Sequence, residues 1–179
     1  MSDRIKIHDL AQIDAALSVM ADEIYNRHQE TPVLIGIRRG GVPIAEHLSD
    51  LLSPKYGHKP QLGIVDINLY RDDWTKARSF PKVGRTEIPI SLEERRVILV
   101  DDVLFTGRTV RAALDVLTEF GRPARVELAC LVDRGHREMP IQADYTSFVI
   151  KTTAQEIVEV DFSKNGRSEG ISLIRTNID

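Results

Sequence analysis

The sequence predicts an α/β fold in which a mostly parallel central sheet is flanked by helices. Three apolar runs rich in β-branched residues, at 33–37, 97–100 and 126–132, are typical of parallel strands covered on both faces. The first two runs are each followed by a glycine-containing turn and then by apolar residues at helical spacing. At 179 residues the chain is long enough for one sizeable core and short for two, so we expect a single domain over residues 1–179.

The composition excludes several classes of protein. The chain carries 24 Lys and Arg against 27 Asp and Glu, which implies no broad cationic field. Cys130 is the single cysteine and lies in an apolar run, so we expect a buried thiol, and a disulfide within one chain is excluded. The N-terminus lacks a basic stretch followed by an apolar core, and no apolar run approaches the ~20 residues that span a bilayer. These features predict a cytoplasmic protein.

The first predicted element is an amphipathic helix. Asp9 can cap its N-terminus with Gln12 as the capping-box partner. Apolar residues then recur at steps of three and four, at Leu10, Ile13, Leu17, Met20 and Ile24. This stripe indicates packing in the core or in a dimer. His28, near the end of the helix, is expected to interact favourably with the helix dipole.

The strand at 33–37 is followed by two arginines and two glycines, Arg38, Arg39, Gly40 and Gly41. Guanidinium and backbone N–H groups at the carboxyl end of a strand can bind an anion such as pyrophosphate. A basic surface turn is the alternative interpretation of the same residues. Pro43 then marks the start of the next helix.

A polar, basic insertion follows the next predicted strand, 61–69, and covers about 70–87. An insertion of this length is either a solvated hairpin or a mobile lid. A lid would have a chemical purpose in a reaction through an oxocarbenium-like centre, because water would capture that centre. The insertion contains the only tryptophan and several cations that could meet a departing anion: Trp74, Arg71, Lys76 and Arg78.

The run from Val97 to Thr109 predicts a phosphosugar site. Asp101 and Asp102 follow the apolar strand, and adjacent carboxylates at this edge of a sheet can bind a vicinal diol or a hard cation. Thr106 and Gly107 then provide a hydroxyl and a flexible backbone where a helix begins, and the N–H groups of a helix start favour a phosphate. The helix is predicted over 110–120, because Gly121 and Pro123 end it.

Other interpretations of this run are weaker. The two acids could be ordinary helix caps and the loop an ordinary βα turn. Nucleotide motifs of other classes fit less well, because the chain has no G-x-x-x-x-G-K-[ST] and no G-x-G-x-x-G after any candidate strand. The absence of both motifs disfavours an NTPase or a dinucleotide-binding protein.

The last third of the chain predicts a further buried strand and a small cap. The strand at 125–132 leads into a polar loop at 133–144, which should border the same crevice. The segments 145–150, 156–161 and 171–175 are predicted as short strands of an antiparallel cap, a hood within about 133–179 that could hold a base.

Four segments together resemble one known family: LYRDD at 69–73, VDDVLFTGRTVRAALD at 100–115, GRP at 121–123 and LVDRGHREMPIQADY at 131–145. The chain is similar to type I phosphoribosyltransferases, and among them to the pyrimidine-operon regulators and uracil phosphoribosyltransferases. The resemblance implies the type I phosphoribosyltransferase fold, with a hood and a flexible loop. It also implies conversion of uracil and phosphoribosyl pyrophosphate (PRPP) to UMP and pyrophosphate with Mg²⁺ as cofactor, and a homodimer or higher oligomer. Many members also bind pyrimidine-operon mRNA.

The resemblance assigns a role to each matching segment. Asp101, Asp102 and Arg71 are expected to be catalytic, and the two aspartates are the tentative Mg²⁺ ligands. The loop Arg38, Arg39, Gly40 and Gly41 is expected to bind pyrophosphate, and Asp133, Arg134, Gly135 and His136 to flank the base. The PRPP-binding motif comprises Val97, Ile98, Leu99, Val100, Asp101, Asp102, Val103, Leu104, Phe105, Thr106, Gly107, Arg108 and Thr109. Phe105 stands where enzymes specific for hypoxanthine and guanine carry an acid, which weighs against that purine class.

The chain departs from the family at positions that resemble its RNA-binding surface. RNA-binding members carry Thr, Arg and His where this chain has Ser18, Val19 and Asp22, and Arg where it has Gln142. Fewer cations and an added acid weaken contacts with phosphates. The first hypothesis is therefore an enzyme. The alternative is an mRNA-binding regulator that senses nucleotides in the same pocket.

Overall fold

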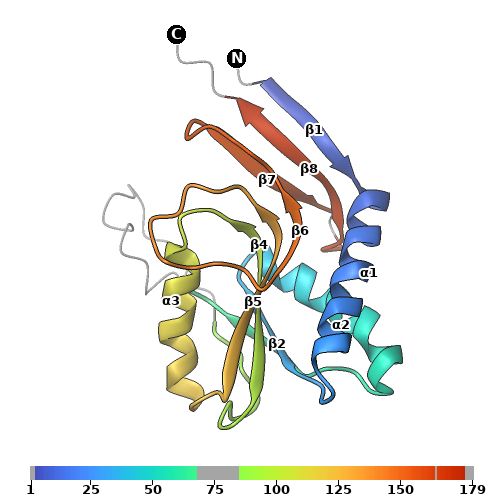
Figure 1. Cartoon of the computed structure of the whole chain (residues 1–179), viewed down its shortest axis with the longest axis vertical. Helices are drawn as coiled ribbons and strands as arrows, with labels where there is room; N and C mark the ends of the chain where they lie inside the picture. The colour runs from blue at the N-terminus through green and yellow to red at the C-terminus, as the bar shows by residue number, and fades with distance from the viewer. Residues whose placement is uncertain (1–2, 68–84, 164, 176–179) are drawn as a thin grey trace.

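The fold combines a five-stranded parallel sheet, covered by helices on both faces, with a separate three-stranded antiparallel sheet (Figure 1). A computed structural model describes residues 3–67, 85–163 and 165–175. The strands are β1 (Asp3–Asp9), β2 (Val33–Ile37), β3 (Leu62–Val65), β4 (Arg96–Leu104), β5 (Arg125–Asp133), β6 (Tyr145–Val149), β7 (Glu156–Phe162) and β8 (Ser168–Arg175). The helices are α1 (Leu10–Arg27), α2 (Gly41–Tyr56), α3 (Arg108–Leu117) and the short 3₁₀-helix η2 (Thr118–Phe120).

The order of strands in the parallel sheet determines where a ligand can bind. The order is β3-β2-β4-β5-β6, so β2 has β3 on one side and β4 on the other. The chain therefore leaves β2 toward β3 and later crosses to the opposite side of β2 to form β4. Connections that leave in opposite directions open a crevice at the carboxyl ends of the two strands, where ligands bind in open α/β sheets. The loop after β2 and the acidic pair of β4 both lie at this edge, as the sequence predicts.

Alternate residues of the parallel strands pack into two separate cores. Leu34, Ile98 and Ala129 face α1 and α2, whereas Leu99 and Cys130 belong to the core beneath α3. Figure 1 shows α1 and α2 on one side of the sheet and α3 on the other. Since both faces are buried, the continuous apolar runs found in the sequence are what such strands require. The predicted α/β fold is confirmed.

Two predicted boundaries change in the PRPP motif. β4 continues through the acidic pair to Leu104, although its pairing with β2 ends at Val100. Asp101 and Asp102 therefore lie beyond the shared end of β2 and β4, where the pairing with β5 continues at Asp101 and Val103. α3 begins at Arg108, earlier than the predicted residue 110, because Gly107 provides the left-handed turn that starts it, with φ +89°.

The predicted hood is wrong in part. Strands at 156–161 and 171–175 do form an antiparallel pair, as β7 and β8. The segment predicted at 145–150 is instead β6, which runs parallel to β5 in the main sheet, because its first residue, Tyr145, is buried in the main core. The third hood strand is β1, which pairs with β8 and was missed in the sequence, although Ile5 and Ile7 alternate with polar residues.

The N-terminal helix agrees with its prediction. Asp9 and Gln12 form the complete capping box, with Gln12 N donating to Asp9 Oδ1 at 2.9 Å and Asp9 N donating to Gln12 Oε1 at 3.0 Å. His28 is the C-cap, and it is buried rather than exposed at the helix end. Within the described ranges, no helix is long and apolar enough to cross a membrane.

Candidate active site

The acidic pair lies at the crevice between β2 and β4. Asp101 is only 5% exposed, and its Oδ1 accepts a hydrogen bond from the Asp102 N–H at 3.0 Å. Asp102 is half-buried, and its Oδ1 accepts the N–H of Val103 at 2.9 Å. Burial, together with the charge of Asp102, raises the pKa of Asp101 well above its usual range. The pair therefore combines a carboxylate open to the crevice with a buried acid that favours its protonated form more than an ordinary aspartate does.

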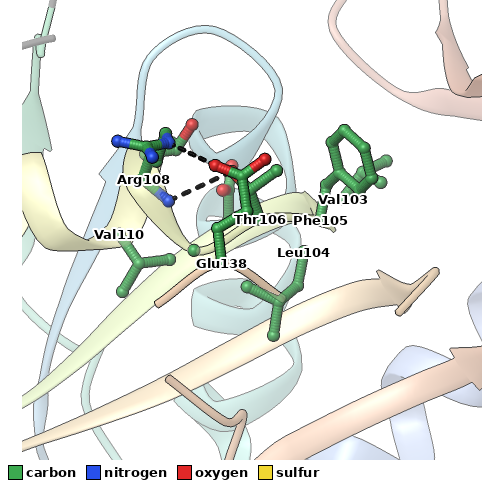
Figure 2. Close-up of a pocket in the computed structure, with 10 residues that line it drawn as sticks. Val103, Leu104, Phe105, Thr106, Arg108, Val110 and Glu138 are labelled. Atoms are coloured by element: carbon green, nitrogen blue, oxygen red, sulfur yellow. Dashed lines mark hydrogen bonds and ion pairs between the residues drawn. The ribbon is translucent and has the colours of Figure 1, made fainter. Parts of the chain in front are cut away.

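A hollow of about 350 Å³ lies at the start of α3 (Figure 2). The N-cap residue Gly107 has no side chain to cap this helix end, and the Arg108 N–H makes only a long hydrogen bond of 3.4 Å to Thr106 Oγ1. The N–H groups of the first turn can therefore turn to an anion. Two features favour glycine at position 107. Its φ is positive, and a Cβ there would lie only 3.1 Å from Cβ of Met139. The hollow is lined by Asp101, Val103, Leu104, Phe105, Thr106, Gly107, Arg108, Thr109, Val110 and Glu138.

Residues after β5 close one side of this hollow. Figure 2 shows the Glu138 carboxylate against the Arg108 side chain, and Arg108 Nε lies 2.6 Å from Glu138 Oε2. The backbone N–H groups of Glu138 and Met139 both donate to the Thr106 carbonyl, at 2.9 and 3.0 Å. The segment that follows β5 is thereby attached directly to residues 105–109, the part of the PRPP motif that the family resemblance assigns to the 5′-phosphate and that we call the phosphate loop.

The loop after β2 packs against the acidic pair from the other side. A Cβ on Gly40 would lie 2.0 Å from Asp102 Oδ2, and one on Gly41 would lie 2.1 Å from the Val100 carbonyl oxygen. The glycines are therefore needed for close approach of the two chains. The peptide bond between Arg38 and Arg39 is cis. A second hollow of about 410 Å³ opens here, lined by Arg38, Arg39, Gly40, Ile67, Asp101, Asp102, Val103 and Thr109.

The two hollows meet at the acidic pair. Asp101, Val103 and Thr109 line both of them. One hollow has a helix N-terminus and hydroxyl side chains, and the other has two arginines, so both suit anions. The arrangement can hold a ligand with two phosphorylated ends joined by a central group that the acids contact.

The predicted base segment lies beside the phosphate loop but lines neither of these two hollows. Asp133 Oδ1 accepts the N–H of Gly135 at 2.9 Å, which folds the segment back on the end of β5. Arg134 is buried, and its guanidinium carbon lies 4.0 Å from the centre of the Phe105 ring. His136 Nε2 is 2.6 Å from the Thr152 carbonyl oxygen, and its ring also approaches Phe105 edge-on. The segment is thus organised around Phe105.

Arg137 is a central residue of the site, although no sequence motif assigns it a role there. Its Nη1 donates to the Phe105 carbonyl at 2.8 Å, and its Nη2 donates to Asp133 Oδ2 at 2.5 Å. Its Nε donates to the Ile141 carbonyl at 2.9 Å. Arg137 thereby joins the phosphate loop to the base segment. No pattern in the polar run 133–144 distinguishes it from its neighbours.

Part of the prediction lies outside the described residues. Arg71, Lys76, Arg78 and Trp74 belong to 68–84, so the catalytic role of Arg71 stays a prediction. The described residues on both sides of that segment are paired, since Ile64 and Glu87 exchange two backbone hydrogen bonds of 2.8 Å.

Asp101 and Asp102 are the described residues best placed to contact a divalent cation. Within 3–67, 85–163 and 165–175, no group of three or more His, Cys, Asp or Glu side chains could hold a metal ion. Mg²⁺ is often bound by one or two carboxylates, with phosphate oxygens of the substrate and water as its remaining ligands. The acidic pair fits a site of this kind, in which the substrate and water complete the set of ligands.

Comparison with known proteins decides the family. Residues 5–163 match the phosphoribosyl transferase domain. The chain belongs to the phosphoribosyltransferase family. Within it, the chain is 48% identical over 174 residues to the "Bifunctional protein PyrR" of Desulfosudis oleivorans, which covers 96% of both chains. Identity to the PyrR of Geobacter sulfurreducens is 46%, covering 97% of this chain and 99% of the relative, so the phosphoribosyltransferase belongs to the PyrR group.

Solved structures support the fold of this phosphoribosyltransferase. A hypoxanthine phosphoribosyl transferase of Trypanosoma cruzi superposes with a TM-score of 0.72 at 18% identity, covering 96% of this chain and 91% of that one. A hypoxanthine phosphoribosyltransferase of Staphylococcus aureus superposes with a TM-score of 0.65 at 18% identity, covering 86% of this chain and 80% of that one. The predicted family resemblance is confirmed by the sequence relatives, and the predicted fold by the structures.

Proposed function

We propose that this phosphoribosyltransferase converts uracil and PRPP to UMP and pyrophosphate. The observation that carries the proposal is the meeting of two anion-binding hollows at Asp101, Val103 and Thr109. PRPP has a 5′-phosphate and a 1-pyrophosphate on one ribose, and the ribose presents a vicinal diol between them. The α3 hollow suits the 5′-phosphate, the acidic pair suits the diol, and the Arg38–Gly41 loop suits the pyrophosphate.

In this proposal the residues act by position and charge. The N–H groups at the start of α3 hold the 5′-phosphate, so the ribose has one orientation in the crevice. Asp101 and Asp102 hold the diol, and the negative charge of Asp102, which is open to the crevice, stabilises positive charge that develops on the ribose as the pyrophosphate departs. The arginines of the β2 loop stabilise the departing anion. The acidic pair would hold Mg²⁺ when it is bound, and the ion would neutralise part of the pyrophosphate charge.

Uracil as the base is supported by the PyrR relatives and by Phe105. This residue holds the base segment through Arg134 and carries no acid that could take a proton from a purine. We also propose that the whole chain acts as one phosphoribosyltransferase domain and forms a homodimer or higher oligomer. One buried cluster supports the single domain, because Val158 and Leu173 of the hood and Ile98 of the main sheet all belong to it.

The direct test is formation of UMP from uracil, PRPP and Mg²⁺, measured beside the same reaction with hypoxanthine, guanine and adenine. We expect UMP formation and no comparable reaction with a purine base. Asp101→Asn and Asp102→Asn should impair this reaction, and Asp50→Asn, which changes an exposed aspartate on α2, serves as their matched control. Faster reaction with a purine base, or no reaction with any base, would contradict the proposal.

A second candidate function is regulation through RNA, and the word "Bifunctional" in the names of the relatives favours it. The surface of α1 argues for weak binding. Val19 is 58% exposed, and Asp22 forms an ion pair with Lys55, which withdraws a cation from the face that RNA would contact. Arg137, which could have contributed a positive charge, is committed to Asp133 and Phe105.

We therefore expect weak binding, with a shallow salt dependence, to the leader RNA of a pyrimidine operon. Each phosphate contact contributes a slope of roughly 0.7 to 0.9 to the dependence of log affinity on log salt, so the measured slope counts the contacts. Asp22→His together with Val19→Arg should increase the affinity and the slope. Tight, UMP-responsive binding by the unaltered chain at physiological salt would show that regulation is a function of this protein.

A further inference from the structure

Asp66 is a buried carboxylate to which the proposed reaction gives no role. It lies just beyond the carboxyl end of β3, is 6% exposed, and precedes Ile67, which lines the pyrophosphate-side hollow. Burial of a carboxylate is unfavourable unless a positive charge or hydrogen bonds compensate. Its Oδ2 lies 3.9 Å from Nε of Arg38, the first residue of the β2 loop.

Arg38 is held at both its backbone and its side chain. Its N–H donates to the Val65 carbonyl at 2.9 Å, and its Nη2 donates to the Arg85 carbonyl at 3.3 Å. Asp66 is held in turn by Thr86, because the Asp66 N–H donates to Thr86 Oγ1 at 3.1 Å. Thr86 Oγ1 also lies 3.5 Å from the Asp66 carbonyl oxygen. Thr86 thereby fixes the backbone of Asp66 at the end of β3, and the Asp66 carboxylate faces the guanidinium of Arg38 at an ion-pair distance of 3.9 Å.

The surroundings of the neighbouring arginine, Arg39, differ from those of Arg38. Arg39 is exposed and lines the same hollow, and it makes no hydrogen bond or ion pair with other residues in the described part of the chain. Two adjacent arginines thus have different surroundings. One is attached to the protein, and the other is available to an anion.

We propose that Asp66 is a positioning residue for pyrophosphate recognition. It holds Arg38 against the end of β3, so that the loop presents Arg39 and its backbone N–H groups to the pyrophosphate of PRPP. This inference rests on the proposed function. Asp66 itself does not touch the substrate, and its effect should be confined to the pyrophosphate side of the crevice. The 5′-phosphate site is built from β4 and α3, whereas Asp66 lies at the end of β3.

The test is the affinity of the Asp66→Asn variant for Mg²⁺-pyrophosphate and for UMP, both measured by calorimetry. UMP carries the 5′-phosphate and the ribose but no pyrophosphate, so it reports whether the rest of the site is intact. We expect about a tenfold to hundredfold loss of pyrophosphate affinity, the scale of effects caused by small displacements of binding groups, and unchanged UMP affinity. The Asp50→Asn control should change neither affinity.

A double-mutant cycle establishes whether Asp66 acts through Arg38. In an Arg38→Gln background, Asp66→Asn should cause little further loss of pyrophosphate affinity, because the interaction is already absent. Thr86→Val provides a second variant in case Asp66→Asn does not fold, and it should weaken pyrophosphate binding in the same direction.

Additive losses in the cycle, equal loss of pyrophosphate and UMP affinity, or unchanged pyrophosphate affinity in both variants would overturn the positioning role. These failures differ from failure of the proposed function. If the unaltered protein bound neither pyrophosphate nor UMP, the assignment of the site as a PRPP site would be wrong, whatever Asp66 does.

Discussion

The Oδ2 atom of Asp102 occupies the place where a side chain on Gly40 would begin, since a Cβ built on Gly40 would lie 2.0 Å from it. The loop after β2 and the acidic pair of β4 therefore fit together only if residue 40 has no side chain. This contact joins the part of the site that suits pyrophosphate to the part that suits the ribose diol.

Gly40→Ala should consequently reduce activity strongly. The added methyl group must displace either the Asp102 carboxylate or the loop, and displacement of a reacting group by about 1 Å can cost a hundredfold in rate. The measurement is kcat/KM for PRPP at saturating uracil. Gly63→Ala is a suitable control, because the nearest atom to its new Cβ would lie 3.3 Å away, in the side chain of Ile88. Full activity of Gly40→Ala would show that Asp102 does not need its present position.

Asp101→Asn should lower activity and increase stability at the same time. Burial and the charge of Asp102 raise the pKa of Asp101 well above its usual range, so the folded state binds this proton more tightly than the unfolded state. Stability is then lost as pH rises from the unfolded pKa, about 3.9, through the higher folded pKa. An uncharged amide removes this loss, while Oδ1 can still accept the Asp102 N–H.

We expect a melting temperature a few degrees higher than that of the unaltered protein at pH 7, where about 1 kcal/mol corresponds to 2–4 °C in a chain of this size. The difference should disappear toward acidic pH, where Asp101 is protonated in both states. Turnover should fall strongly. Asp102→Asn should also impair turnover, but its effect need not add to that of Asp101→Asn because the two carboxyl groups interact. A melting temperature unchanged at every pH would contradict the raised pKa.

Arg137→Lys should loosen the connection between the phosphate loop and the base segment. Lysine keeps the charge but cannot reproduce the planar fork that contacts Phe105, Asp133 and Ile141 together. We expect a loss of about 2–3 kcal/mol in the free energy of unfolding and a KM for uracil raised more than the KM for PRPP. Arg4→Lys is the control, because Arg4 makes only exposed ion pairs in the hood. Equal changes in the two KM values would mean that Arg137 has a general structural role.

The local part of the site could be predicted from sequence. Strand, acids, glycine turn and helix start follow one another between Val97 and Thr109, so their relative placement is set by the elements that contain them. Gly107 illustrates this, because the left-handed conformation and the helix start occur at one residue. The loop after β2 could be predicted for the same reason.

Relationships between distant segments could not be predicted. Asp66 lies within the predicted strand 61–69, but the observed strand ends at Val65, and the burial of Asp66 arises from residues 86–87, which pair beside β3. Arg137 is one polar residue among many in the sequence, and its role is visible only where it donates to the Phe105 carbonyl. The strand at Tyr145 could be recognised, but alternation does not reveal whether its partner runs parallel or antiparallel, and the antiparallel prediction was wrong. The missed strand β1 did carry a local signal, in Ile5 and Ile7.

A buried polar network around Glu127, near the start of β5, predicts that the stability of the protein depends on pH. Glu127 Oε2 lies 2.5 Å from His28 Nε2 and accepts the Tyr145 hydroxyl at 3.1 Å, and Arg125 Nε lies 3.0 Å from its Oε1. Glu127 and His28 are both 3% exposed. Burial alone would raise the pKa of Glu127, but the charge and hydrogen bond of His28, with Tyr145 and Arg125, outweigh burial and lower it.

Glu127→Gln should therefore destabilise the protein at neutral pH. The substitution leaves His28 and Arg125 facing an uncharged amide, and we expect a loss of about 3 kcal/mol, the lower end for breaking a buried pair, because Arg125 still reaches solvent. The folded-state pKa of Glu127 lies below the unfolded value of about 4.3, so its contribution is complete above that pH and is lost as pH falls toward the folded pKa.

The difference in unfolding free energy between Glu127→Gln and the unaltered protein should thus narrow below pH 4, as measured by urea unfolding across a pH series. Glu159→Gln provides the matched control, because Glu159 pairs with Arg4 on the surface and such pairs contribute about 0–1 kcal/mol. PRPP turnover should survive in Glu127→Gln at temperatures where the variant is folded, since the network makes no hydrogen bond to the residues assigned to the substrate. If Glu127→Gln were as stable as the control at pH 7, then His28, Tyr145 and Arg125 would not depend on the carboxylate for their placement.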